Sequence, residues 1–315
     1  MHVIRGLHNC RKSHQNGVLT IGNFDGLHLG HQKMLEQLRD EAKRLDAHRL
    51  LMTFEPLPRE FFARGKCTTA RLMNRAEKIR TLNAFAPAIR PEHLLILNFN
   101  QALADMSAAT FIEKILVDKL KINAVIIGDD FRFGCDRQGD FKLLQQYGDR
   151  HRFAVTSIQS HCLENQRVSS SLIREALADD QLSQADNMLG RAYTICGHVC
   201  HGDKRGRSIG FPTANIHLRR AETPLKGVYS VTMHSQKYGD IAGIANLGRR
   251  PTVGGERIQL EVHLFDFDAS LYGDRVCVSF QHKIRDEKKF DSFDDLKTQI
   301  KIDCEQARQL LTHSH

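Results

Sequence analysis

Short apolar runs alternate with amphipathic stretches along the first 160 residues or so. Five runs have the length and apolar content of buried strands: VLTIG (18–22), LLMTF (50–54), LLILNF (94–99), AVIIG (124–128) and RFAVTSI (152–158). Between them, four segments carry apolar residues at helical spacing: residues 31–45, 74–85, 107–120 and 140–148. This alternation predicts an α/β domain with a doubly wound parallel sheet, in which ligands bind at the carboxyl ends of the strands.

The pattern changes in the second half of the chain. Residues 168–190 predict one or two helices, and closely spaced strands with glycine-rich turns follow. The predicted strands are YTICGHVC, KGVYSVTMH, DIAGIANLG, IQLEVHLFDF and DRVCVSFQH, which together indicate a small antiparallel barrel. A last helix is expected over 292–311, with Ser292 as its N-cap. We place the boundary near residue 186, which gives domains of residues 1–185 and 186–315.

Composition and charge narrow the class of protein. With 315 residues, 41% of them hydrophobic and 26% charged, the chain is typical of globular proteins. No apolar run reaches the roughly 18 residues that span a bilayer, and the N-terminus lacks the apolar core of a signal peptide. We therefore expect a cytoplasmic protein without a membrane partner. The net charge of +8 is spread along the chain, which favours phosphorylated small molecules over nucleic acid as partners. The oligomeric state stays open.

The eight cysteines are scattered through a long chain. This distribution predicts reduced thiols in a reducing compartment and no disulfide framework. The segment Cys196-Gly-His198-Val-Cys200-His201 contains metal-ligating residue types, but it alternates like a strand and has no second ligand cluster at zinc-finger spacing. We assign no metal to it.

The stretch TIGNFDGLHLGHQKML (20–35) places His28 and His31 in the turn between the first predicted strand and the first predicted helix. Main-chain amides at a helix N-terminus favour phosphate, and two histidines add further donors. Such a turn suits a reaction in which the phosphate of one substrate attacks the α-phosphorus of a triphosphate, because no side-chain nucleophile is needed. By itself the motif is a weak signal, because short histidine-rich turns are common in loops.

The same stretch resembles the signature of the nucleotidylyltransferase superfamily. Three further segments, TFEPLPREFF (53–62), IIGDDFRFGCDRQGD (126–140) and VSSSLIREAL (168–177), resemble the FAD synthetase half of the bacterial bifunctional riboflavin kinase/FAD synthetases in the same order and at similar separations. The resemblance implies a Rossmann-like fold and adenylyl transfer from ATP to FMN, with FAD and pyrophosphate as products.

Carried over to this chain, the resemblance implies a set of site residues in the N-terminal domain. His28 and His31 would hold the ATP phosphates as catalytic donors, while Phe62 and Asp130 would lie along the flavin. Further nucleotide contacts would come from Gly22, Asn23, Phe24, Asp25, Gly30, Ser170, Ser171 and Arg174. Ser171 stands where the family usually has threonine, so a hydroxyl is retained. Two structural alternatives stay open: Phe62 and Phe131 as core residues, and residues 169–171 as a helix cap.

A second motif, HGDKRGRSIGFPTANIHL (201–218), combines a basic glycine-rich loop with a Pro-Thr-Ala-Asn turn. Glycines allow main-chain amides to approach phosphate, and the Thr213 hydroxyl and the Asn215 carboxamide oxygen are hard ligands of the kind that Mg²⁺ prefers. Without further context, a purely structural strand–turn–strand is the better interpretation.

This motif and four later segments together resemble the riboflavin kinase module. The segments are LKGVYSV (225–231), GIANLGRRPTVGG (243–255), LEVHLFDFDASLYG (260–273) and KIRDEKKFDSFDDLKTQI (283–300). The resemblance implies a six-stranded antiparallel barrel with a terminal helix. It also implies an ATP and Mg²⁺ site at Gly206, Gly210, Pro212, Thr213 and Asn215, with the last two as metal ligands. Glu261 matches the catalytic base that takes the proton from the ribityl 5′-hydroxyl as it attacks the γ-phosphorus of ATP.

We therefore expect a bifunctional enzyme that phosphorylates riboflavin to FMN in its C-terminal domain and adenylylates FMN to FAD in its N-terminal domain, using ATP and Mg²⁺ in both steps. One alternative is another cytidylyl- or adenylyltransferase with a barrel domain for a different substrate. A second is a flavin- or RNA-binding regulator built from degenerate copies of both domains. The presence of His28, His31, Thr213, Asn215 and Glu261 counts against degeneracy.

Overall fold

Two compact units make up the chain in the computed structural model. The structure describes residues 1–63, 69–159, 161–163, 166–201, 210–218, 220, 222–252 and 255–312. One unit consists of Met1–Thr68 and Lys78–Ser169, and the other of Thr69–Glu77 and Ser170–His315. Segment 69–77 therefore belongs with the C-terminal part of the chain although it lies within its first hundred residues.

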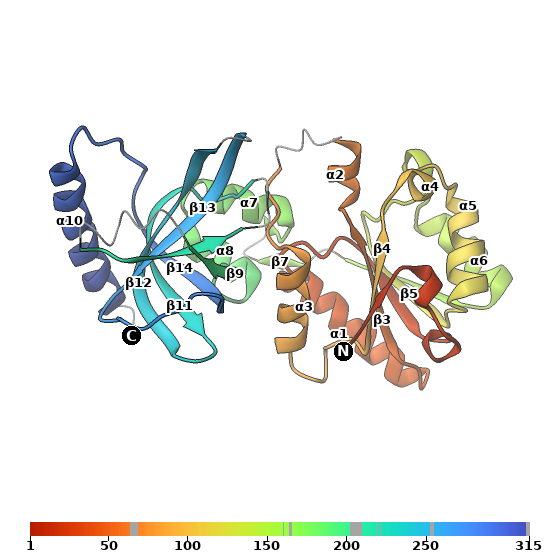
Figure 1. Ribbon diagram of the computed structural model, residues 1–315. Coiled ribbons are helices and arrows are strands. Elements are labelled where there is room, and N and C mark those ends of the chain that lie inside the picture. The colour runs from red at the N-terminus through yellow and green to blue at the C-terminus, as the bar shows by residue number, and fades with distance from the viewer. Residues whose placement is uncertain are drawn as a thin grey trace. The chain divides into compact units, whose positions relative to one another are not determined.

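A parallel sheet of six strands forms the centre of the first unit, in the order β1-β4-β3-β2-β5-β6 (Figure 1). The strands are β1 (His2–Arg5), β2 (Val18–Ile21), β3 (Arg49–Glu55), β4 (His93–Asn98), β5 (Ala124–Gly128) and β6 (Ala154–Ile158). The predicted parallel sheet is confirmed, and its five predicted strands are β2 to β6. The sequence pattern does not predict β1, because its four residues include a single fully buried side chain, that of Ile4.

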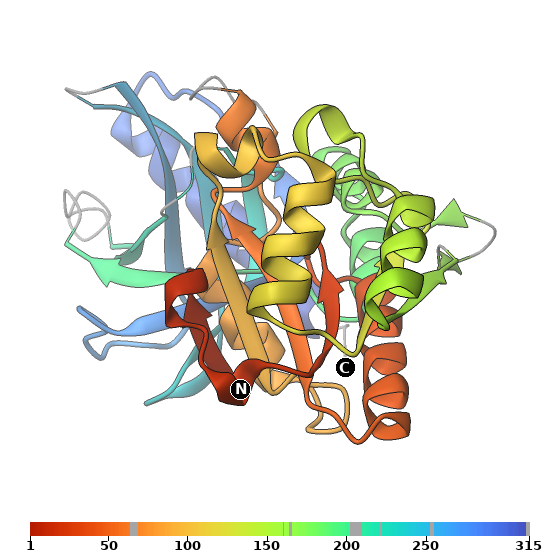
Figure 2. The ribbon, with the colours of Figure 1, turned by 90° about the vertical axis from the view of Figure 1, so that its right-hand side faces the viewer.

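Helices cover both faces of this sheet (Figures 1 and 2). They are α1 (Leu29–Arg44), α2 (Pro58–Phe62), α3 (Arg75–Ala84), α4 (Gln101–Ala104), α5 (Ala108–Phe111), its π-helical continuation η3 (Ile112–Lys119) and α6 (Phe141–His151). Short 3-10 turns span Leu7–Asn9, Lys12–His14 and Cys135–Arg137, and a hairpin of β7 (Cys162–Leu163) and β8 (Gln166–Arg167) follows β6. On one face, α5, η3 and α6 bury Phe111, Ile115 and Leu144 against the sheet. The buried stripe Leu35, Leu38 and Ala42 of α1 packs on β2, β3 and β5.

A closed antiparallel barrel forms the centre of the second unit, in the order β10-β13-β12-β11-β14-β9. Its strands are β9 (Thr194–Cys200), β10 (Thr213–His217), β11 (Gly227–Ser235), β12 (Gly239–Thr252), β13 (Gly255–Leu264) and β14 (Arg275–Arg285). The unit also contains α7 (Ser170–Ala178), α8 (Leu182–Leu189) and α10 (Phe293–Thr312). The six-stranded barrel that the resemblance implied is confirmed.

The terminal helix α10 closes one side of the barrel (Figure 1). Its first turn is capped as expected, because the main-chain N–H of Asp295 donates to Oγ of Ser292 at 3.1 Å. Cys304 and Ala307 pack against Val228 of β11 and Ile244 of β12. No helix among the described residues is long and apolar enough to cross a membrane.

The expectation of eight reduced thiols is wrong for two cysteines. Cys196 and Cys277 form a disulfide bond. They are register partners on the neighbouring antiparallel strands β9 and β14, with their Cα atoms 4.1 Å apart. Their side chains therefore meet on the same face of the barrel wall, a proximity that is not evident in the sequence, where the two cysteines are 81 positions apart.

Candidate functional site

The turn between β2 and α1 has an unusual backbone. Phe24 and Leu27 both have φ 47° and Gly26 has φ 90°, so three of four consecutive residues lie in the left-handed region. This conformation costs energy for residues with a Cβ and persists only where the surroundings impose it. The side chains of Phe24 and Leu27 are fully buried. Packing in the core therefore holds the turn in one shape at the carboxyl end of β2.

The two histidines of this turn lie face to face. His28 is the N-cap residue of α1 and is buried, and its ring stacks on that of His31 with centroids 3.7 Å apart. The ring of Phe24 lies 4.9 Å from His31 on centroids. A Cβ at Gly30 would come within 3.2 Å of the His28 ring, so glycine gives that ring its room. The structure thus brings two imidazoles together at the N-terminus of a sixteen-residue helix.

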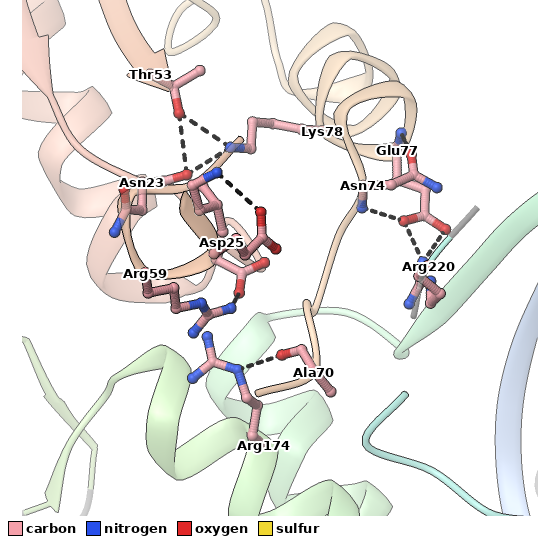
Figure 3. Close-up of polar contacts among 12 residues, drawn as sticks. Asn23, Asp25, Thr53, Arg59, Ala70, Asn74, Glu77, Lys78, Arg174 and Arg220 are labelled. Atoms are coloured by element: carbon pink, nitrogen blue, oxygen red, sulfur yellow. Dashed lines mark hydrogen bonds and ion pairs between the residues drawn. The ribbon is translucent and has the colours of Figure 1, made fainter. Parts of the chain in front are cut away.

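Buried polar contacts support the turn from two other helices (Figure 3). Nη2 of Arg59, from α2, pairs with the buried carboxylate of Asp25 at 2.8 Å. Nζ of Lys78, from α3, donates to the main-chain oxygen of Asn23 at 2.6 Å and to Oγ1 of Thr53 at 3.2 Å. Sequence analysis missed Arg59, Thr53 and Lys78, because they lie outside the turn motif and only the fold brings them to it.

Phe62 and Asp130 follow other strands of the same sheet. Phe62 ends α2, after β3, and Asp130 follows β5. Because all six strands are parallel, these segments lie at the same edge as the histidine turn. The side chain of Phe62 is 62% exposed, with its ring edge-on to Phe99 at 5.8 Å, so it is not a core residue. The carboxylate of Asp130 pairs with Arg167 at 2.6 Å.

Ser170, Ser171 and Arg174 belong to the second unit. Ser170 and Ser171 are the first two residues of α7. Nε of Arg174 donates to the main-chain oxygen of Ala70 at 2.7 Å (Figure 3). Their role in phosphate binding stays a prediction.

A second group of polar residues lies on the barrel wall. Asn215 of β10 and Asn246 of β12 are both register partners of Glu261 on β13, one on each side. Residues directly opposite each other in antiparallel strands share a face. Gln259, two positions before Glu261, donates from Nε2 to Oδ1 of Asn215 at 2.5 Å and to Oε1 of Glu261 at 3.2 Å. Sequence analysis assigned no role to Gln259 or Asn246, although both lie in segments that it quoted, because only the strand register places them beside Glu261.

The same face carries the residues expected to bind a metal. Thr213 and Asn215 are two positions apart on β10, so both point to the face of Glu261. Hydroxyl, carboxamide and carboxylate oxygens are therefore together, and this set of hard donors fits Mg²⁺.

The structure describes residues 210–212, which directly precede β10. The main-chain oxygen of Pro212 lies 2.9 Å from Nδ1 of His263. Gly210 has φ 88°, a conformation that favours glycine. Gly206 lies outside the described residues.

Comparisons with known proteins cover both groups of residues. A family model described as FAD synthetase matches residues 10–172, and one described as riboflavin kinase matches residues 189–311. A bifunctional riboflavin kinase/FMN adenylyltransferase of Haemophilus influenzae is 48% identical over 308 residues, which are 98% of each chain. One of Escherichia coli K12 is 45% identical over 310 residues, 98% of this chain and 97% of the relative.

A solved structure is similar to this chain over nearly all of its residues. It is a crystal structure from Streptococcus pneumoniae titled as a macrolide-efflux protein, with 30% identity and a TM-score of 0.81 over 98% of this chain and 99% of that chain. The assignment of activity to this chain rests on the sequence relatives and the two family models.

Proposed function

This chain belongs to the family of bifunctional riboflavin kinase/FMN adenylyltransferases, and from this premise we propose which of its residues carry out the two reactions. The enzyme phosphorylates riboflavin with ATP to FMN, and adenylylates FMN with ATP to FAD and pyrophosphate. The observation that carries this conclusion is the full-length match to bifunctional relatives, with a separate family model over each part. A regulator made of degenerate domains finds no support.

For adenylyl transfer, we assign the phosphates of ATP to the turn at the N-terminus of α1. A phosphate oxygen of FMN forms a bond to the α-phosphorus as the bond from that phosphorus to the bridging oxygen of pyrophosphate breaks. His28 and His31 donate hydrogen bonds to the charge that grows on the phosphates. Gly22, Asn23, Phe24, Asp25 and Gly30 shape the turn around them. The buried contacts of Arg59 and Lys78 support this proposal, because they hold the donors in place before substrate binds.

The flavin of FMN is assigned to the same edge of the sheet. The exposed ring of Phe62 offers a surface on which an isoalloxazine ring can stack, and Asp130 offers a hydrogen-bond acceptor. Ser170, Ser171 and Arg174 complete the phosphate contacts in this proposal, as the resemblance of their motif implies.

For the kinase reaction, we assign the base to Glu261. Its carboxylate accepts the proton of the ribityl 5′-hydroxyl while that oxygen bonds to the γ-phosphorus and ADP leaves. The contact with Gln259 and the register position between Asn215 and Asn246 support this role, since they orient the carboxylate. Gly206, Gly210 and Pro212 form the adjoining nucleotide loop.

Mg²⁺ is part of the proposal. Thr213 and Asn215 would hold it, and the ion would neutralise phosphate charge as the γ-phosphoryl group moves. The chemistry of the oxygen donors on β10 and β13 supports the assignment. Removal of divalent cations with EDTA is expected to stop FMN formation, and added Mg²⁺ to restore it. Because Asn215→Ala removes one ligand, it should shift the Mg²⁺ requirement upward.

We propose that the two activities belong to two domains that meet near residue 186. Adenylyl transfer is assigned to residues 1–185 and the kinase reaction to residues 186–315. The two family matches, which end at residue 172 and begin at residue 189, support it. The cytoplasm is the proposed location, because both reactions consume ATP.

The direct test is incubation of the purified protein with riboflavin and Mg-ATP, followed by chromatographic separation of the flavins. FMN and then FAD should accumulate. Binding of riboflavin without formation of either product would contradict the proposal.

A further inference from the structure

Three histidines of the first unit form a cluster that neither reaction uses. One ring nitrogen from each of His2, His14 and His93 lies within 4.8 Å of the other two. The ring centroids of His2 and His14 are 5.4 Å apart, and those of His14 and His93 are 4.9 Å apart. The sequence gives no sign of this group, because its members lie 12 and 79 positions apart along the chain.

The sheet brings these histidines together at one edge. His2 and His93 begin the neighbouring strands β1 and β4 and are register partners, and His14 ends the 3-10 turn Lys12–His14. All three therefore lie at the amino ends of parallel strands, the edge opposite to the turn with His28 and His31. The cluster is a separate site from the one proposed for ATP and FMN.

One imidazole nitrogen of the cluster is open to a ligand. His14 is only 4% exposed, and Nδ1 of His93 is buried without a hydrogen-bond partner among the described residues. A metal ion can bind to this nitrogen through its lone pair without displacing a hydrogen bond that the structure shows there.

We propose that His2, His14 and His93 form a binding site for a divalent transition-metal ion of the zinc type. Three imidazole nitrogens suit Zn²⁺, and they leave a fourth position for water. With Zn–N distances of about 2.0–2.1 Å, tetrahedral ligand nitrogens lie about 3.3 Å apart. The three rings must therefore move together by up to about 1.5 Å, which side-chain rotation at the exposed His2 makes easy.

Metal binding at His14 would break one hydrogen bond of the structure. The main-chain N–H of Arg11 donates to Nδ1 of His14 at 3.1 Å. An ion on Nδ1 would displace this donor, and an ion on Nε2 would place a proton on Nδ1 facing it. Either way the hydrogen bond to Arg11 is lost, at about 1 kcal/mol. Zinc binding must therefore change the surroundings of the Arg11 amide.

The test is a Zn²⁺ titration of the untagged full-length enzyme against a chelating dye. His2→Ala removes an exposed ligand and should leave the fold intact, while His93→Gln removes a half-buried one. Each is expected to weaken Zn²⁺ binding by at least about tenfold, the scale of lost ligand support at metal sites. His151→Ala is the matched control, because this exposed histidine stacks on Tyr147 outside the cluster. All variants keep the eight cysteines, so differences between them report the histidines alone.

A second readout is independent of affinity. In ¹H–¹⁵N spectra, Zn²⁺ should shift the Arg11 amide in the wild type, and a higher Zn²⁺ concentration should be needed for the same shift in His2→Ala. Riboflavin kinase and FMN adenylyltransferase rates without added zinc should be the same in His2→Ala and wild type. Equal zinc affinity in the wild type and His2→Ala, or an equal loss in His151→Ala, would overturn the proposal.

Discussion

Asn215 and Glu261 face each other across β10 and β13 as register partners. The side chain of Gln259 bridges them, because its Nε2 donates to Oδ1 of Asn215 at 2.5 Å and to Oε1 of Glu261 at 3.2 Å. The proposed metal ligand and the proposed base are thus held on one wall of the barrel, although they lie 46 positions apart in the chain.

Glu261→Gln tests the assignment of the base. The substitution keeps the size of the side chain but removes its ability to accept a proton at neutral pH. We expect FMN formation to slow by about 10²–10⁴-fold, the usual contribution of a general base, with little change in riboflavin affinity. FMN supplied from outside should still become FAD at the wild-type rate. A retained kinase rate would exclude Glu261 as the base, and loss of both reactions would indicate misfolding.

His28→Ala and His31→Ala test the turn before α1. Each removes a donor to charge that develops during adenylyl transfer, so FAD formation should fall by about 10²–10³-fold. FMN formation should be unaffected, which serves as the internal check of folding. His8→Ala is a suitable control, since His8 is an exposed histidine of the same unit. Near-normal adenylylation in a folded double variant would refute the assignment.

Lys78→Met tests whether the hydrogen bonds of Lys78 are needed to position the turn before α1. The variant keeps the length of the side chain and removes the hydrogen bonds from Nζ to Asn23 and Thr53. Because displaced donors lose alignment with the phosphates, we expect the kcat of adenylyl transfer to drop by about 10- to 10²-fold with a smaller change in KM. Lys78→Arg should recover part of the rate. An unchanged kcat of adenylyl transfer in Lys78→Met would show that packing alone positions the turn.

Glu77→Ala should destabilise the second unit. Glu77 and Arg220 form an ion pair in which both side chains are at most 3% exposed, and Glu77 also accepts the main-chain N–H of Cys196 at 2.8 Å. Removing the carboxylate breaks this buried ion pair, which costs about 3–5 kcal/mol of unfolding free energy. Chemical denaturation measures this loss. Asp286→Ala is the control, because Asp286 is 87% exposed and its partner Lys283 keeps Asp180; an equal loss there would contradict the argument.

Asp186 should make stability depend on pH. Burial raises its pKa to about 6, against the opposing effects of the Tyr193 N–H and Arg191. Between about pH 4 and pH 6 the folded protein therefore binds more protons than the unfolded chain, so the unfolding free energy falls as pH rises. Asp186→Asn keeps an acceptor for the Tyr193 N–H and removes this contribution. Denaturation curves across this range should diverge between the two proteins, and parallel pH profiles would contradict the prediction.

Much of the fold follows from local patterns. The strands β2 to β5 are apolar runs because both of their faces are buried in a parallel sheet. The turn with His28 and His31, and the turn with Thr213 and Asn215, are also local, since their chemistry lies within a few neighbouring positions. Strands and turn motifs of this kind depend on short-range patterns, so they can be predicted from a single sequence.

The tertiary structure alone decided which distant residues meet. Lys78 reaches Asn23, Cys196 meets Cys277, Glu77 joins the second unit through Arg220, and His2, His14 and His93 converge at one sheet edge. None of these contacts has a periodic signature, because each joins elements that are distant in the sequence and meet only when the chain packs. The sequence by itself therefore determined the strands β2 to β6, the antiparallel barrel and the residue types in the two turns. Packing determined the partners that hold those turns in place.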